Sequence, residues 1–198
     1  MDGDLAEAVS AMKAIFEQRK IPARFEAADE AVVRKVRQSL PVTERYGAFL
    51  REANPVDVET FTPSERIRFI PAAHVLREQV GFGLADGATT QRDGWRKGWI
   101  VIAHSTLLGD PYFIDTSRPD VEGDCPVMTA MTGTDSLRPV LCASSFACFL
   151  RILTAAMEVA AGFALESFDD QDDAIFREAV SPKIRVIDTA ALRSGHWT

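Results

Sequence analysis

The chain has 198 residues, of which 46% are apolar and 26% are charged, and its formal net charge is −7. These values are typical of one globular domain with a substantial core. The acidic balance argues against non-specific binding of nucleic acid, which needs clustered Lys and Arg. It suits a basic protein partner, because complementary charge speeds encounter. Solubility alone is the simpler explanation of the same acidity.

Two segments are candidates for a secretory signal or a membrane-spanning helix, and neither fits. Residues 1–20 lack the basic start and apolar centre of a secretory signal. The most apolar region, residues 139–165, is interrupted by Arg151 and Glu158, so it predicts a buried helix and no membrane span. The cysteines are odd in number and lie in apolar runs, which is typical of buried free thiols in a reducing compartment. They are Cys125, Cys142 and Cys148. We therefore expect a cytoplasmic protein.

The first half of the chain alternates helical and strand-like patterns. Apolar spacing and stop signals predict helices first, then two strands and a short helix. The expected helices cover 4–19, 29–39 and a short third segment around Tyr46, Phe49 and Leu50; strands follow at 56–61 and 66–70, and a helix over 72–80.

The second half predicts a strand meander followed by long helices. Short turn sequences containing Gly, Asp and Pro separate the runs, which favours antiparallel hairpins. The expected strands are 99–104, 111–116, 125–131 and 137–142; a helix from Ser144 or Ser145 to about 163 follows, then a helix starting in the acidic run 169–173, a strand at 184–187 and a loose tail.

This order predicts an α+β fold with an antiparallel meander of about four to six strands, helices packed on one side and a C-terminal helical extension. We expect a single domain over 1–198. Its core would span about 25–163, with an N-terminal helix at 4–19 and an extension over about 164–198.

Several short motifs occur in a fixed order over about residues 40–155. They are Phe49-Leu50 followed by Asn54, the strand–helix element from Ile70 to Val80, Trp99 with Ile100 to Ala103, Gly109-Asp110 before Tyr112-Phe113-Ile114-Asp115, Val127, and Ser145-Phe146 before Phe149-Leu150. In this order they resemble the SUKH superfamily, named for the yeast Smi and Knr cell-wall regulators and their bacterial relatives.

The resemblance implies a binding domain without catalytic residues. Bacterial members neutralise toxins, often nucleases, by tight binding, whereas the eukaryotic relatives are regulatory scaffolds. Both roles imply a protein partner, such as a basic toxin domain, without nucleic acid, membrane or cofactor; the oligomeric state stays open. The positions expected to be structural are Trp99, Gly109, Asp110, Tyr112, Asp115 and Phe146.

Five acidic residues lie in and around the predicted second strand of the meander, namely Asp110, Asp115, Asp120, Glu122 and Asp124. They could be solvated turn residues, a surface for a basic partner, or ligands of a hard cation, although their spacing does not match an EF-hand. We favour turn chemistry for most of them and expect no metal. The residues assigned to partner binding are Trp95, because Trp is common at binding hot spots, and the acids Asp120, Glu122 and Asp124, because they suit a basic partner.

An enzyme of unrecognised type remains an alternative. Cys142 or Cys148 with His104 could form a thiol–imidazole pair, but both cysteines lie in apolar runs that favour packing. Ser144-Ser145 is better explained as a helix cap, and Gly81-Phe82-Gly83 as a turn. We therefore assign no catalytic residue.

Overall fold

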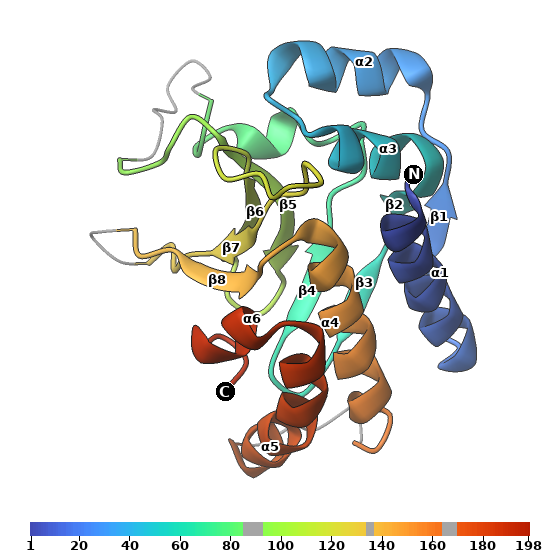
Figure 1. Cartoon of the computed structure of the whole chain (residues 1–198), viewed down its shortest axis with the longest axis vertical. Coiled ribbons are helices and arrows are strands. Elements are labelled where there is room, and N and C mark those ends of the chain that lie inside the picture. The colour runs from blue at the N-terminus through green and yellow to red at the C-terminus, as the bar shows by residue number, and fades with distance from the viewer. Residues whose placement is uncertain (85–92, 134–136, 164–169) are drawn as a thin grey trace.

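The structure, a computed structural model, describes residues 1–84, 93–133, 137–163 and 170–198. Within these ranges it is an α+β fold with a six-stranded antiparallel sheet, a separate two-stranded sheet and helices (Figure 1). The helices are α1 (Gly3–Gln18), α2 (Glu30–Ser39), α3 (Glu44–Ala53), α4 (Phe146–Ala160), α5 (Asp170–Ile187) and α6 (Thr189–Arg193), with a 3-10 turn η1 (Arg77–Gln79). The strands are β1 (Arg24–Glu26), β2 (Asn54–Val56), β3 (Glu59–Phe61), β4 (Arg66–Phe69), β5 (Trp99–Ser105), β6 (Pro111–Asp115), β7 (Val127–Thr129) and β8 (Val140–Ala143).

The large sheet is a meander in which β3 to β8 pair in chain order. Every neighbouring pair is antiparallel. For β5 to β8 the connections that contain Gly, Asp and Pro predicted this pairing. The register shifts between Val101 and Ala103 where β5 meets β6. Such an irregularity bends a strand and increases its twist, which helps the sheet to curl. The predicted α+β class and antiparallel meander are confirmed.

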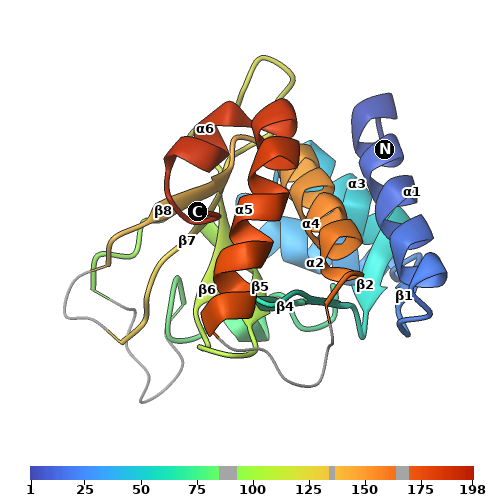
Figure 2. The ribbon, with the colours of Figure 1, turned by 90° about the horizontal axis from the view of Figure 1, so that it is seen from below.

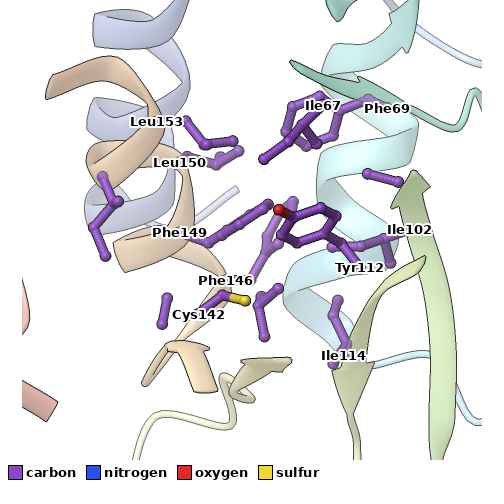
Figure 3. Close-up of a cluster of buried hydrophobic side chains, with 14 of the residues drawn as sticks. Ile67, Phe69, Ile102, Tyr112, Ile114, Cys142, Phe146, Phe149, Leu150 and Leu153 are labelled. Carbon is purple, nitrogen blue, oxygen red and sulfur yellow. The ribbon is translucent and has the colours of Figure 1, made fainter. Parts of the chain in front are cut away.

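Helix α4 is the centre of the helical layer. It lies between α1 and α5 in two perpendicular views (Figures 1 and 2). Its apolar side chains face the sheet, where Phe149 lies 5.6 Å from the Tyr112 ring of β6, measured between ring centroids (Figure 3). Ser145 begins the helix by accepting a hydrogen bond from the Cys148 amide, as a cap should.

The opposite face of β6 is also buried. Phe113 contacts Trp99 of β5 at 4.6 Å and Trp95 at 4.9 Å between centroids. Phe82 completes this cluster at 4.9 Å from Trp95. Because all five residues of β6 are buried, this strand is covered on both faces and forms the middle of the core.

Two short elements differ from their predictions. The strand expected over 56–61 is divided, because Asp57 adopts a left-handed φ of +55° that interrupts the extended chain. Its first part, β2, pairs with β1, a strand that we did not predict, and β3 pairs with β4. The helix expected over 72–80 consists of turns ending in η1.

The C-terminal residues correct two predictions. Residues 184–187 are the last turn of α5 and are not a strand. The tail is not loose: Trp197 is buried and its indole Nε1 donates to the Cys142 carbonyl at 2.8 Å. Asp188 caps α6 and also accepts from the Ser144 amide at 2.5 Å. The core thus extends beyond the expected 25–163, from Leu5 in α1 to Trp197.

We predict that Trp197→Ala lowers the free energy of unfolding by about 3–5 kcal/mol, because it removes a large buried ring and leaves the Cys142 carbonyl without its donor. Urea titration followed by circular dichroism measures the change. Val186→Ala, at an exposed position of α5, is the control and should change stability by less than about 0.5 kcal/mol. A small effect of Trp197→Ala would mean that the tail does not contribute to the core.

Candidate functional site

The acidic loop is organised around one arginine. Arg45 of α3 is 9% exposed, and its guanidinium lies 2.5 Å from Glu122 Oε2 and 3.2 Å from Asp124 Oδ2. Its Nε lies 2.6 Å from Asp2 Oδ2, at the start of α1. Burial lowers the pKa of this guanidinium, but the carboxylates outweigh burial and raise it overall. Arg45 therefore pairs with two of the three acids of this loop, Glu122 and Asp124.

Asp124 has a structural role, which corrects its assignment to a partner surface. It is only 1% exposed, and its carboxylate accepts from the amides of Phe146 and Ala147, each at 3.1 Å. These amides belong to the first turn of α4, where backbone donors lack helical partners and favour a negative charge. Asp124 thus joins α3 to the start of α4, and no partner can reach it in this structure.

The other two acids of the loop, Asp120 and Glu122, interact mainly with other groups of the chain. Asp120 Oδ1 accepts from the amides of Glu122 and Asp124, both at 2.9 Å, which is turn chemistry. Glu122 is exposed but paired with Arg45. Neither residue is excluded from touching a partner, but the loop does not present a row of free carboxylates.

The assignment of Trp95 to partner binding is also corrected. This side chain is 6% exposed and lies in the aromatic cluster beside Trp99 and Phe113. Its indole Nε1 donates to the Trp99 carbonyl at 3.2 Å. This ring covers the sheet and does not form an exposed anchor. Sequence alone could not separate these roles, because a Trp at the end of a polar loop suits either one.

The six motif positions lie in the meander and at the start of α4. Tyr112, Phe146, Trp99 and Asp115 are buried. Asp115 Oδ1 accepts from the Ser117 hydroxyl, and Gly109 adopts a φ of +75°, which favours glycine in this turn. Asp110 differs, because it lies at the edge of a cleft.

The cysteines and histidines do not form the alternative thiol–imidazole pair. Cys142 is fully buried, and burial raises its pKa well above the usual thiol value. Burial also raises the pKa of Cys148 and, to about 11, that of Cys125. His104 instead lies 3.3 Å from Glu78. The described residues contain no group of three or more His, Cys, Asp or Glu suited to a metal ion.

A cleft of about 840 Å³ lies between the meander and the C-terminal tail. Its walls come from the β5–β6 turn, the ends of β7 and β8, helix α5 and the residues after α6. Its lining residues are Ser64, Glu65, Leu108, Asp110, Tyr112, Thr129, Ala130, Met131, Arg138, Val140, Arg177, Ser194, Gly195, His196 and Thr198. A concave site with polar groups converging on it is the usual form of a binding site.

Glu65 carries the charge in the floor of this cleft. Its Oε1 accepts from the Ser105 hydroxyl at 2.7 Å and from the Arg66 amide at 2.9 Å. Its Oε2 accepts from the Tyr112 hydroxyl at 3.1 Å. Burial raises the pKa of this carboxyl, and the hydrogen bonds only partly oppose that effect.

The C-terminal tail supplies the second polar wall. His196 Nε2 lies 3.2 Å from the Tyr112 hydroxyl, and its pKa is lowered to about 4, first by burial and then by Arg177. Arg177 of α5 holds this wall, since its Nη1 donates to the His196 carbonyl at 3.0 Å. Asp173 accepts from Arg177 Nε at 2.8 Å, which balances the guanidinium charge.

The entrance to the cleft is apolar. Leu108 is 70% exposed and Met131 is 64% exposed, and both line the cleft. Asp110 connects the two segments that carry them, because its Oδ1 accepts from the amide and hydroxyl of Thr132. Large exposed apolar side chains beside a polar depression are typical of interaction sites.

Sequence reasoning missed Glu65, Arg177 and His196 as site residues. We expected the tail to be loose, so nothing placed His196 beside Tyr112. One signal was present, namely the four-residue spacing of Phe176, Val180 and Ile184, which predicts a packed helix up to the tail.

A scan of family models and searches of curated proteins and of solved structures found no match. Among the described residues, no helix is both long enough and apolar enough to cross a membrane.

We predict that Asp124→Asn lowers the free energy of unfolding by about 3 kcal/mol, because it removes the charge from a buried ion pair that also caps α4. Glu122→Gln is the matched control and should cost less than about 1 kcal/mol, since Glu122 is exposed. Urea denaturation of both variants measures the difference. Equal losses would contradict a special role for Asp124.

The lowered pKa of His196 predicts a pH dependence of stability. Between pH 6.5 and about 4 the unfolded chain binds a proton at this histidine that the folded chain does not, so stability falls as the pH falls. The full contribution is about 3 kcal/mol. Glu65 acts in the opposite direction, because its pKa is raised in the folded protein and its protonation therefore favours folding.

The contribution of His196 is isolated by comparing the wild type with His196→Gln over pH 4–7. We expect the difference in unfolding free energy between them to change by about 3 kcal/mol across this range. Urea denaturation at each pH provides the values. Parallel curves for the two proteins would refute the prediction.

Proposed function

We propose that this chain is a non-catalytic, cytoplasmic protein-binding domain of the immunity type, which neutralises a toxin, such as a nuclease, by docking over the cleft beside the C-terminal tail. The observation that carries the proposal is the cleft itself, with Leu108 and Met131 exposed at its entrance and charged groups in its floor. Apolar anchors surrounded by polar groups supply most of the binding energy in protein interfaces.

The order of motifs that resembles the SUKH superfamily supports the same class of protein. The partner surface proposed here differs from the acidic loop that the sequence favoured. Arg45 pairs with Glu122 and Asp124 of that loop, whereas Leu108 at the entrance of the cleft is 70% exposed. A regulatory scaffold could use the same surface, and it would bind several proteins weakly where an immunity protein binds one tightly.

One observation favours an enzyme as a second candidate. Glu65, Tyr112 and His196 form a hydrogen-bonded chain in a cleft, and the pKa of each is shifted, as is common in active sites. At neutral pH, however, His196 is uncharged and Tyr112 keeps its proton, because the pKa of Tyr112 is well above its usual value. The bases in the chain are then the Glu65 carboxylate and the neutral His196 ring, whose low pKa makes it a weak base at neutral pH. Among the described residues, no acid poised near neutral pH stands beside them, which suits binding better than proton transfer.

Three matched variants test where a partner docks. Leu108→Asp places a charge at the cleft, Val121→Asp places one on the acidic loop, and Val186→Asp places one on α5; all three native side chains are more than half exposed. The tagged proteins are used for affinity purification from the source cells, and the affinity of any co-purifying protein is then measured by calorimetry with each variant.

We expect one stoichiometric protein whose affinity falls at least about tenfold with Leu108→Asp, since a charge buried against an apolar partner surface is costly. The other two variants should bind like the wild type. Loss of binding with Val121→Asp alone would show that the partner docks on the acidic loop and not at the cleft. Several weak partners would favour the scaffold, and retention of the partner by Leu108→Asp would refute docking at the cleft.

A further inference from the structure

Glu65 is a partly buried carboxylate without a counter-ion among the described residues. Its three hydrogen-bond donors are the Ser105 hydroxyl, the Tyr112 hydroxyl and a backbone amide, and all of them are neutral. The neighbouring Arg66 guanidinium is directed elsewhere, since it lies over the Phe61 ring at 5.5 Å from the centroid. Buried carboxylates are usually paired with a cation, because leaving one unpaired is unfavourable.

The cleft leaves acceptor oxygens available. Glu65 Oε1 accepts two hydrogen bonds and Oε2 accepts one, so Oε2 keeps capacity for another donor. The second carboxylate of the cleft, Asp110, uses Oδ1 for Thr132, and no donor from the described chain reaches its Oδ2. With respect to the described residues, one oxygen of Glu65 and one of Asp110 can therefore still receive a hydrogen bond.

The two arginines that line the cleft form no ion pair with the Glu65 carboxylate in its floor. Arg177 is paired with Asp173 and bound to the tail, so it forms part of the wall. Arg138 is exposed at the entrance and makes no ion pair with a described residue. The entrance also carries Leu108 and Met131, which suits an aliphatic chain that ends in a charge.

We propose that Glu65 receives the charged end of a Lys or Arg side chain from the docked protein, with Asp110 as the second acceptor and with the aliphatic part of that side chain packed between Leu108 and Met131. This inference rests on the proposed function and adds the chemistry by which the cleft selects its partner. A charge-assisted hydrogen bond to a desolvated carboxylate is roughly twice as strong as a neutral one, so it can decide which residue enters.

The test uses small probes and the whole chain. The ¹⁵N-labelled protein is titrated with Nα-acetyl-lysine methylamide and Nα-acetyl-arginine methylamide, and with the norleucine and citrulline analogues as uncharged controls. We expect the cationic probes to shift the amide signals of Arg66, Tyr112 and Ala130, and the neutral analogues to bind at least about tenfold more weakly.

Variants assign the binding to the carboxylate. Glu65→Gln should weaken the cationic probes about tenfold or more, whereas Glu178→Gln, which changes an exposed acid of α5, should bind like the wild type. Asp110→Asn keeps an oxygen for Thr132 and should give an intermediate loss. Thermal unfolding and the ¹⁵N spectrum of each variant establish whether it is folded. If Glu65→Gln does not fold, Asp110→Asn still tests the cleft.

Failure of this inference can be told apart from failure of the proposed function. If a protein docks at Leu108 but the cationic probes do not bind, or bind equally to Glu65→Gln, the inference is wrong and the proposed function stands. If the probes bind through Glu65 but no protein docks at the cleft, the site takes small cations. Both the proposed function and a partner's side chain as the ligand are then overturned.

Discussion

The Asp124 carboxylate connects three helices, because it binds the start of α4 and the Arg45 side chain of α3, which in turn binds Asp2 at the start of α1. Since α4 forms the middle of the helical layer, its position on the sheet depends on how its first turn is held. A charge at a helix N-terminus is stabilising on its own, and pairing with a buried guanidinium makes its loss more costly than loss of a surface acid.

The cleft depends on a different set of contacts, those of the C-terminal tail. Trp197 binds the carbonyl of Cys142 in β8, and Asp188 binds the amide of Ser144 just before α4. These contacts place His196 beside Tyr112 and thereby close one side of the cleft. The scaffold of sheet and α4 is thus separate from the wall that shapes the candidate binding surface.

Local signals explain what could be predicted. Turn chemistry between apolar runs predicted the meander, and Ser145 predicted the start of α4. Strand β1 was missed because its three residues carry no pattern of their own and are held by pairing with β2. Residues 184–187 looked like a strand because β-branched residues dominate them, although the four-residue spacing from Phe176 was already helical. The site was the least predictable part, because whether Glu65 meets a counter-ion among the described residues is a property of packing and not of sequence.

The attachment of the tail has a consequence for affinity. If the proposed docking at the cleft is right, local opening of a wall held by a few side chains would make the binding-competent form a fraction of the native population. The apparent dissociation constant is the intrinsic one divided by that fraction. Substitutions at Trp197 or Asp188, neither of which lines the cleft, would then change apparent affinity without altering a single contact to the partner. Under the proposed function, the strength of binding would therefore be adjustable through the attachment of the tail while its specificity stays unchanged.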